Sequence, residues 1–300
     1  MKLTIEFVTM KITLKNEKLT TISIVGLVSK PDDASLRPYI EEIQKALNKH
    51  QAKLLIEEES AKLLGYEGFE FETICKESDF LISLGGDGTL ISLCRKSFAC
   101  AKPVLGIHAG KLGFLTDIQT NEIEAFIEDI FAGNYRIDTR MMLEVSLHVK
   151  GDIQKVVAFN DIVFSRSQIS HMTTIKAFVD GHLFNSYYGD GLIVSTPTGS
   201  TAYNLSAGGP VVYPLMEALI LTPICPHSLT QRSLVLPVDF EISFESSDDT
   251  VVVVDGQDTY QMSDVDFVSV KIADKGAQLI HSLDRNYFDV LKNKLHWGNV

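Results

Sequence analysis

The hydrophobic pattern of this 300-residue chain changes near Asn134, and this change limits the possible folds more than any other feature. Before Asn134, short apolar runs alternate with segments whose apolar residues recur at helical spacing. After it, apolar runs follow one another with only turns between them, and helical spacing is scarce. A chain of this length can hold two domains, and the two patterns indicate two different architectures.

The first half is predicted to be a Rossmann-like α/β domain. Apolar runs predict strands at residues 22–28, 53–57, 79–84 and 103–108. Helical spacing predicts helices at three places, which are the segment containing Leu36, Ile40, Ile43 and Leu47, the segment after Gly88, and residues 123–131. Strands that alternate with helices favour a parallel, doubly wound sheet.

The second half is predicted to be an all-β, sandwich-like domain. Its predicted strands lie at residues 143–149, 156–164, 174–179, 192–195, 251–255 and 267–272. The tail from Asn286 to Trp297 is helical again. We therefore expect four parts: an N-terminal extension at 1–21, the α/β domain at 22–135, the β-rich domain at 136–284, and a C-terminal helix at 285–300. No Pro/Gly-rich linker separates the domains, so we expect them to be tightly joined.

A glycine-rich turn, Gly85-Gly86-Asp87-Gly88-Thr89, joins a predicted strand to a predicted helix. Glycine permits backbone angles that other residues avoid, and the N-terminus of a helix favours an anion. An acidic side chain would repel a phosphate, so Asp87 suits the role of proton acceptor or metal ligand. The alternative is an ordinary tight turn in which Asp87 caps the helix. The turn alone does not decide between these interpretations.

Two further segments carry polar groups in apolar surroundings. Residues 195–201 contain Ser and Thr hydroxyls between apolar flanks, and such a loop can present many donors and acceptors to a polar ligand. Its alternative is an ordinary exposed turn. The pair Asn160-Asp161 interrupts an apolar run, and there the alternative is a β-bulge or the end of a strand.

The overall charge argues against some classes of partner. The formal net charge is -12, which disfavours non-specific binding to nucleic acid or to an anionic membrane. The first twenty residues lack the apolar core of a signal peptide, and no run reaches the ~18 apolar residues of a membrane span. We therefore expect a cytoplasmic protein.

Taken together and in this order, these segments resemble the bacterial NAD kinase family. The resemblance covers roughly residues 22–298 and includes the segments 112–116, 190–210, 226–229 and 295–298. The glycine turn is shared with diacylglycerol-type lipid kinases and phosphofructokinases. The run Thr-Pro-Thr-Gly-Ser-Thr-Ala-Tyr at residues 196–203 is what narrows the resemblance to NAD kinases.

The resemblance implies an enzyme that transfers the γ-phosphate of ATP to the 2′-hydroxyl of the adenosine ribose of NAD, which gives NADP. Asp87 would be the catalytic proton acceptor. The positions that would bind the dinucleotide are Asp87, Gly88, Asn160, Asp161, His171, Tyr188, Asp190, Thr201, Ala202, Tyr203, Asn204, Leu205, Ser206 and Gln257. The family also implies a homodimer or homotetramer with part of the NAD site near the subunit contact, and a C-terminal helix packed on the first domain.

The chain departs from the family pattern at two of these positions. The usual acid after the asparagine is Glu, whereas this chain has Asp161, which is shorter by one methylene. Several family members carry a basic residue where this chain has Tyr188. Cationic contact with the substrate at that position is therefore not expected here.

Phosphoryl transfer passes through a loose transition state in most analyses, so the ribose proton leaves late and a carboxylate within ~3 Å suffices as acceptor. We expect Mg²⁺ or Mn²⁺ to arrive with ATP, because the sequence offers no all-protein metal cage. Two rival functions remain, a diacylglycerol-type lipid kinase and a non-catalytic dinucleotide sensor. The sequence leaves open whether polyphosphate replaces ATP and whether NADH is a substrate.

Overall fold

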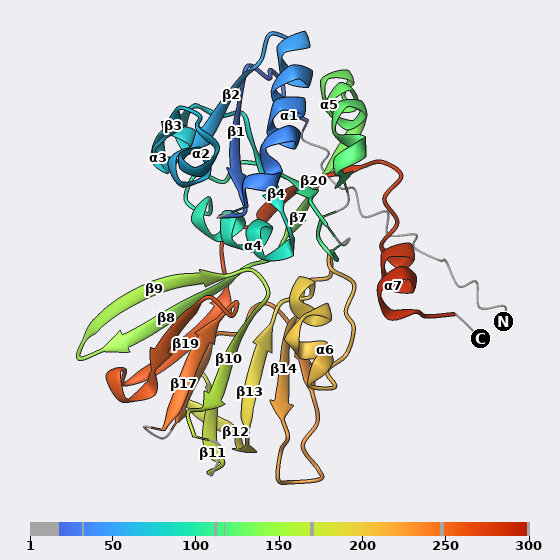
Figure 1. The fold of residues 1–300 in the computed structure, drawn as a ribbon. Coiled ribbons are helices and arrows are strands. Elements are labelled where there is room, and N and C mark those ends of the chain that lie inside the picture. Colours follow the sequence, from blue (N-terminus) through green and yellow to red (C-terminus); the bar gives the residue numbers. More distant parts are fainter. Residues whose placement is uncertain are drawn as a thin grey trace, which may run out of the picture.

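The computed structural model describes residues 18–31, 33–110, 113–116, 118–168, 171–246 and 249–298. Residues 1–17 of the expected N-terminal extension lie outside this range, as does Leu112 of the 112–116 segment. Figure 1 shows two halves, with the mixed α/β half above two β-sheets and α4 at the junction. Within the described residues, no helix is both long and apolar enough to cross a membrane.

The α/β half is built on a largely parallel sheet. Its strand order is β3-β2-β1-β4-β5-β20-β7, with β6 paired to β5. Among the described strands of this sheet, the β20–β7 pair alone is antiparallel. The strands are β1 (Ile24–Ser29), β2 (Lys53–Glu57), β3 (Gly68–Phe69), β4 (Phe80–Gly85), β5 (Val104–His108), β6 (Ile118–Gln119), β7 (Tyr135–Arg140) and β20 (Ala277–Ser282).

Helices cover both faces of this sheet. One apolar cluster joins α1 and α5 through residues such as Ile43 and Phe126, and another joins α3 and α4 through Ile74 and Leu93. The helices are η1 (Ala34–Leu36), α1 (Arg37–Lys49), α2 (Glu58–Leu64), α3 (Phe71–Glu77), α4 (Asp87–Lys96), η2 (Thr120–Glu122) and α5 (Ile123–Ala132). The strand order reverses between β1 and β4, where open α/β sheets bind ligands.

The β-rich half is a sandwich, as predicted. One sheet has the order β15-β14-β13-β10-β17-β18 and the other β12-β11-β16-β19-β8-β9. The rings of Phe164 and Phe244, one from each sheet, lie 4.7 Å apart in the shared core. The first sheet contains β10 (Asp161–Arg166), β13 (Gly191–Ser195), β14 (Leu219–Ile224), β15 (Leu234–Leu236), β17 (Thr250–Val254) and β18 (Asp258–Gln261). The second contains β8 (Leu143–Val149), β9 (Asp152–Ala158), β11 (Thr173–Val179), β12 (His182–Gly189), β16 (Ile242–Ser246) and β19 (Phe267–Ile272). Short helices add η3 (Thr198–Thr201), α6 (Tyr203–Ser206) and η4 (Met262–Asp264).

The predicted strand at residues 156–164 is wrong, because two strands occupy this segment. β9 ends at Ala158 in one sheet, and β10 begins at Asp161 in the other. Between them, the backbone N–H groups of Phe159 and Asn160 each donate to the carboxylate of Asp255 at 2.7 Å. These amides are therefore satisfied outside any strand ladder, which lets the chain cross from one sheet to the other.

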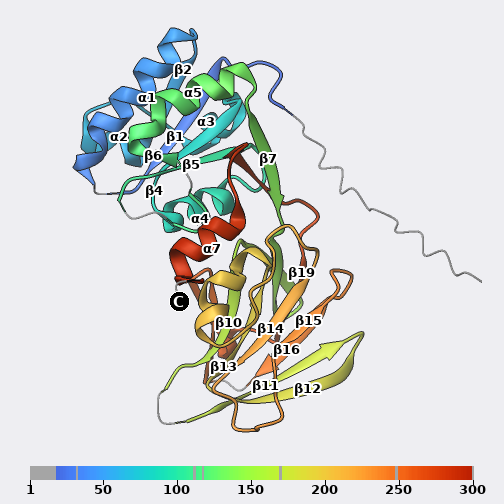
Figure 2. The ribbon, with the colours of Figure 1, turned by 90° about the vertical axis from the view of Figure 1, so that its right-hand side faces the viewer.

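The end of the chain returns to the α/β half. β20 lies between β5 and β7 in the sheet of the α/β half, although the expected boundaries placed residues 277–282 with the β-rich domain. The boundaries themselves stay a prediction. α7 (Tyr287–Leu295) follows, and Figure 2 shows it beside α4 at the junction of the halves. Tyr287 stacks edge-on against Tyr213 at 5.4 Å, while the Nζ of Lys294 lies 5.9 Å from the ring centre of Phe114, so α7 contacts both halves.

Candidate active site

Asp87 is the first residue of α4 and points away from the helix that it begins. Its Oδ2 accepts a hydrogen bond from the Phe114 amide at 2.7 Å, and its Oδ1 accepts from the amides of Leu115 and Thr116, each at 3.2 Å. The N-cap of α4 is Gly86, and no side chain caps the helix. The interpretation of Asp87 as a helix cap is therefore wrong. Its carboxylate is instead fixed against the loop after β5.

The parallel sheet explains this contact. β4 and β5 are neighbours, so their carboxyl ends lie side by side and the chain after β5 passes the start of α4. A Cβ atom on Gly113 would overlap the Asp87 carboxylate. Only glycine leaves room for Asp87 here. Sequence analysis placed Gly113 in the segment 112–116 that resembles the family but assigned it no role of its own.

A pair of carboxyl groups lies at the start of β10. Asp161 is buried, and the side chain of Asp255, directly after β17, is fully buried. Burial, followed by the nearby charge of Asp255, raises the pKa of Asp161 to about 7. Burial also raises the pKa of Asp255, against the hydrogen bonds from the amides of residues 159–161 and the charge of Arg95. Sequence analysis had not singled out Asp255.

Arg95, near the end of α4, connects this pair to the α/β half. Its Nε donates to the Val157 carbonyl at 2.9 Å and lies 3.4 Å from Asp255 Oδ2. Its Nη1 donates to Gln257 Oε1 at 2.9 Å, and its Nη2 forms an ion pair with Asp258. One arginine therefore ties α4 to β9 and to the β17–β18 turn. No sequence motif marked it.

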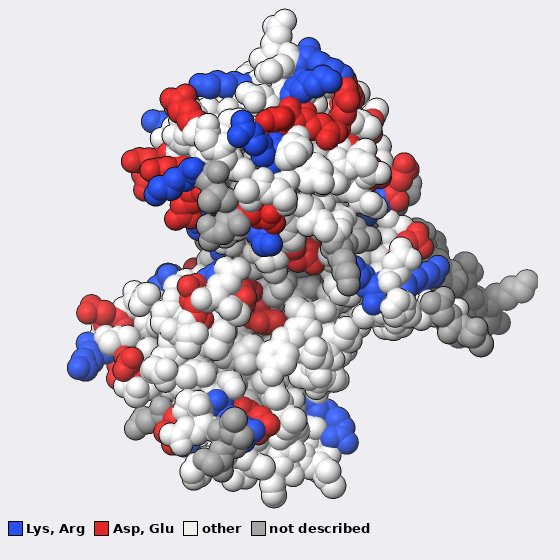
Figure 3. Space-filling model, viewed as in Figure 1, with Lys and Arg blue, Asp and Glu red and all other residues white. Residues whose placement is uncertain are grey.

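Gln257 also reaches the glycine turn. Its Nε2 donates to the carbonyl oxygen of Gly88 at 3.4 Å. Gly88 and Gln257 were both predicted to bind the dinucleotide, and the structure brings them into contact across the junction of the two halves. Figure 3 shows the hollow at this junction, with acidic and basic atoms around it.

A pocket of about 430 Å³ opens in the β-rich half at this junction. Its lining includes four of the predicted dinucleotide-binding residues, together with Asp255 and Gly256 beside Gln257. The lining residues are Asn160, Asp161, Val163, Ser165, Ala202, Tyr203, Val253, Asp255 and Gly256. The pocket contains a carboxyl pair, an amide and an aromatic ring, which suits a polar ligand that has both hydroxyls and a ring system.

The hydroxyl-rich loop supports this pocket from within. Ser195, Thr196 and Ser200 are fully buried. Thr196 Oγ1 donates to the Phe159 carbonyl at 2.9 Å, and the Thr196 amide donates to the Asn160 carbonyl at 2.9 Å. These groups bond within the fold, whereas the sequence suggested that they would face a ligand. They hold the turn that carries Asn160.

Asn204 is likewise internal. Its Nδ2 donates to the carbonyls of Ser200 and Pro210, and its Oδ1 accepts from Thr222 Oγ1 at 2.7 Å. Its predicted neighbours on α6 differ in exposure. Leu205 is half-buried and Ser206 is exposed, while Thr201, in η3, is half-buried with its Oγ1 3.4 Å from the Thr198 carbonyl.

Three predicted residues lie at the other end of β10. Asp190 Oδ1 is 3.2 Å from Nε of Arg166, the last residue of β10, whereas Asp161 is the first. Tyr188 is exposed and lies 5.6 Å from the His227 ring, and His171 is also exposed. None of the three lines the 430 Å³ pocket. A strand of this length spans about 17 Å, so they are separate from Asn160 within one chain.

His108, at the end of β5, is buried beside the glycine turn. Within the described part of the chain, neither of its ring nitrogens has a hydrogen-bond partner. Burial, with a smaller contribution from Lys294, lowers the pKa of this histidine. The lowered pKa favours the neutral form of the His108 ring, which packs beside β4.

Comparisons with known proteins show the family of this chain. Residues 25–135 match the ATP-NAD kinase N-terminal domain, and residues 159–282 match the ATP-NAD kinase C-terminal domain. A protein of Sulfurimonas denitrificans named NAD kinase is 48% identical over 92% of this chain and 98% of its own length. One of Wolinella succinogenes, also named NAD kinase, is 45% identical over 95% of this chain and 99% of its own.

Solved structures are similar over most of the chain. A yeast NADH kinase in complex with NADH has a TM-score of 0.85 at 27% identity, covering 93% of this chain and 89% of that one. An NAD kinase from Archaeoglobus fulgidus in complex with ATP has a TM-score of 0.72 at 24% identity and shows the same fold; the match covers 91% of this chain and 98% of that one. With both domains matched and relatives near half identical, the chain belongs to the NAD kinase family.

Proposed function

We propose that this protein is an NAD kinase, which transfers the γ-phosphate of ATP to the 2′-hydroxyl of the adenosine ribose of NAD. The observation that carries the proposal is the meeting of two sites. The turn containing Asp87 touches, through Gly88 and Gln257, the rim of the pocket lined by Asn160 and Asp161. The family's name, ATP-NAD kinase, supports both substrates.

NAD would occupy the 430 Å³ pocket. Tyr203 offers an exposed ring on which a base can stack, and Asn160 offers an amide that both donates and accepts. Asp161 has a pKa near 7, so it can either accept from a hydroxyl or, when protonated, donate. With these partners, the adenosine end of the dinucleotide would lie toward the glycine turn.

Asp87 would orient the 2′-hydroxyl and take its proton. Its Oδ2 accepts one protein hydrogen bond, from Phe114, which leaves a lone pair for the hydroxyl. The amides that fix the carboxylate also limit its freedom to turn, so its direction toward the acceptor is set before the substrate arrives. Because the transition state is loose, the proton needs to move only after the phosphoryl group has begun to transfer.

The phosphates of ATP would lie at the start of α4, where backbone N–H groups and the helix dipole favour an anion. We propose that Mg²⁺ or Mn²⁺ enters as part of the metal–ATP substrate, in which the ion neutralises charge on the phosphates. Within the described residues, no group of three His, Cys, Asp or Glu side chains is placed to hold a metal. The nearest carboxylate, Asp87, is already bonded to backbone amides.

We further propose a homo-oligomer in the cytoplasm, where ATP and NAD are present. His171, Tyr188 and Asp190 lie at the far end of β10 from Asn160. In a dimer or tetramer, these three residues would complete the NAD pocket of a neighbouring subunit. This arrangement would give a role to the predicted residues that one chain does not bring into its own pocket.

The test is incubation of the purified protein with Mg²⁺, ATP and NAD, followed by an assay specific for NADP. We expect NADP to form, and chelation of the metal with EDTA to stop its formation. Parallel reactions contain diacylglycerol vesicles in place of NAD, or polyphosphate in place of ATP. Phosphorylated lipid without NADP would establish the lipid-kinase alternative, which the NAD kinase relatives do not favour. Tight NAD binding without any ATP-dependent product would establish the sensor.

A further inference from the structure

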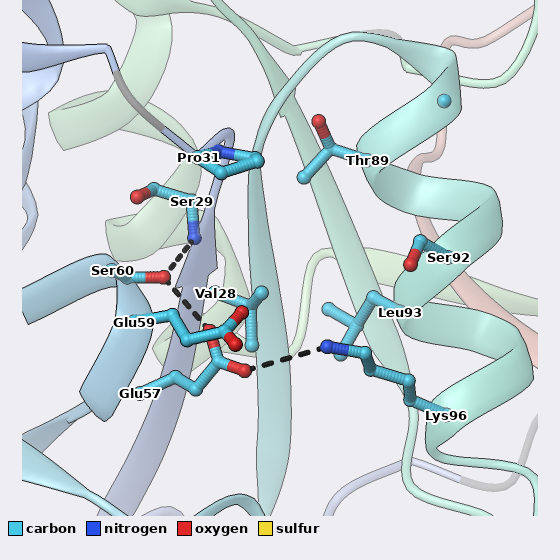
Figure 4. Close-up of a pocket in the computed structure, with 11 residues that line it drawn as sticks. Val28, Ser29, Pro31, Glu57, Glu59, Ser60, Thr89, Ser92, Leu93 and Lys96 are labelled. Carbon is cyan, nitrogen blue, oxygen red and sulfur yellow. Dashed lines mark hydrogen bonds and ion pairs between the residues drawn. The ribbon is translucent and has the colours of Figure 1, made fainter.

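A second pocket, of about 300 Å³, lies on the other side of the glycine turn. It is bounded by the end of β1, the end of β2 with the start of α2, and one side of α4. Figure 4 shows Glu57 and Ser60 across the pocket from Ser92 and Lys96 of α4. Gly88 and Thr89 close its end nearest the turn. No step of the mechanism above uses this pocket.

The polar centre of the pocket is the carboxylate of Glu57, whose side chain is only 8% exposed. Ser60 Oγ donates to Glu57 Oε2 at 3.1 Å and is itself fixed by the Ser29 amide, which donates to it at 2.9 Å. Among the described residues, the single partner of Glu57 Oε1 is the half-exposed ammonium group of Lys96, 3.6 Å away. A carboxylate has about four acceptor positions, so the Glu57 carboxylate is held in place and can still accept further hydrogen bonds.

The charges of the pocket select the ligand. Glu57 and Glu59 contribute two carboxylates, and Lys96 contributes one ammonium group, so an anion is disfavoured here. Hydroxyl donors are favoured. The pocket also lies at the carboxyl edge of β1 and β2, beside the reversal of strand order. In dinucleotide-binding α/β folds, an acidic side chain near this position accepts the ribose hydroxyls of the nucleotide.

We propose that this pocket binds the ribose of ATP, with Glu57 accepting hydrogen bonds from its 2′- and 3′-hydroxyls. The triphosphate then runs past Gly88 and Thr89 to the amides at the start of the ten-residue helix α4. Gly88 lines this pocket, while its carbonyl oxygen accepts from Gln257 on the acceptor side. The donor and acceptor pockets therefore flank one turn, and the γ-phosphate meets the 2′-hydroxyl of NAD there. This inference rests on the proposed kinase function.

The test compares ATP with 2′-deoxy-ATP and 3′-deoxy-ATP in the wild type, Glu57→Gln and Glu58→Gln. Glu58 is the exposed neighbouring acid outside the pocket and serves as the matched control. In the wild type, loss of a hydroxyl should raise the KM for the nucleotide about tenfold, because hydrogen bonds to charged groups are strong. Glu57→Gln should raise the KM for ATP by a similar factor and remove most of the discrimination. The KM for NAD should stay at the value of the control.

Two outcomes overturn the inference. One is a Glu57→Gln enzyme that discriminates between ATP and the deoxynucleotides as well as the wild type does. The other is a Ser92→Phe enzyme, in which a ring fills the pocket from α4, with the wild-type KM for ATP. The second variant keeps the test valid if Glu57→Gln fails to fold.

Calorimetric titration with ATP separates this inference from the proposed function. If the wild type forms no NADP, the kinase proposal fails, and binding of ATP to the wild type and to Glu57→Gln still reports on the pocket. Equal affinities overturn the ribose site. A loss of about tenfold in the variant, with binding of 2′-deoxy-ATP unaffected by the substitution, supports it.

Discussion

At the scale of single residues, the site depends on how carboxylates are held. Asp87 is oriented by three backbone amides of the loop after β5, and Asp255 by three amides between β9 and β10. Both carboxylates fix backbone segments that are distant in sequence. The glycine turn marked Asp87 as a candidate, and the family resemblance gave it the predicted catalytic role. The sequence could not identify Asp255, because the amides that this residue accepts from lie about ninety residues earlier and carry no side-chain signature.

Gly113→Ala tests the orientation of Asp87. The added methyl group would overlap the carboxylate and must push it from the amides of residues 114–116. We expect kcat to fall by about a hundredfold, because misplacement of a reacting group by about 1 Å has that effect. The KM for NAD should change little. Gly110→Ala, in the same loop but with open space around its Cβ position, is a partial control, since its φ of +124° adds backbone strain. Steady-state kinetics that show equal kcat values for Gly113→Ala and the wild type would contradict the assigned orientation.

Asp161→Asn tests the buried carboxyl pair through the pH dependence of stability. The pKa of Asp161 is about 7 in the fold, against an ordinary value of 3.8 for an aspartate carboxyl. Between these values, the folded state keeps a proton that the unfolded chain releases, so stability falls as pH rises toward 7. Above pH 7, the buried charge of Asp161 lies close to the carboxyl group of Asp255, which disfavours it. Asparagine removes this charge.

We therefore expect Asp161→Asn to stabilise the protein more at pH 8 than at pH 5, by about 2 kcal/mol in the free energy of unfolding. Urea titration of both proteins at the two pH values measures the difference. A difference between variant and wild type that is the same at pH 5 and pH 8 would show that Asp161 does not titrate in this range.

At the scale of elements, α4 joins the two halves. Its first residue, Asp87, carries the proposed proton acceptor, and Arg95, two turns later, contacts Val157, Asp255 and Gln257 of the β-rich half. A single helix thus sets the position of the glycine turn relative to the proposed NAD pocket. The ion pair with Asp255 is largely buried, since Arg95 is 12% exposed and Asp255 is not exposed at all.

Arg95→Met should destabilise the protein by about 3 kcal/mol, because it leaves the buried Asp255 without its counter-charge. It should also raise the KM for NAD, since Gln257 and residues 159–161 lose their common partner. Arg37→Met provides the control, because its ion pair with Glu41 is exposed and contributes little. Thermal unfolding and steady-state kinetics measure both effects. Equal loss of stability in the two variants would refute the role of Arg95 as a buried link.

Most elements were predictable from local pattern, and the exceptions have physical causes. β2, β8 and β19 match their predicted ranges, because apolar alternation or runs suffice for strands. α2 and α3 each have seven residues, which is too short to establish a helical period, and they were not predicted. The break between β9 and β10 depends on Asp255 and could not be found locally. Placing β20 in the sheet of the α/β half requires its parallel pairing with β5, about 170 residues earlier in the sequence.

At the scale of the whole molecule, one chain carries the predicted NAD contacts at two separate places. Asn160, Asp161, Ala202 and Tyr203 line a common pocket, whereas Tyr188 and Asp190 lie at the other end of β10. The sequence resemblance could name both sets but could not say whether they meet within one chain. The proposed site shared between subunits would account for both sets.

Subunit mixing tests the shared site. Asp87→Asn should inactivate a site from one side, and a Tyr188→Ala, Asp190→Asn double variant should inactivate it from the other. After co-refolding, a dimer of one variant with the other would carry one intact site, and random pairing should restore about a quarter of the wild-type rate. If the mixture stays as inactive as the separate variants while forming hetero-oligomers, each site is built within a single chain.

NADP formation by the wild type and by Asp87→Asn, with NAD binding measured on the same samples, tests the proposed role of Asp87 most directly. Asparagine keeps the size of the side chain but removes the charge and the ability to take the ribose proton. We expect the wild type to form NADP from NAD, ATP and Mg²⁺. We expect Asp87→Asn to bind NAD with similar affinity but to lose turnover by at least about a hundredfold. Folded Asp87→Asn protein that forms NADP at the wild-type rate would contradict the role of Asp87 as proton acceptor.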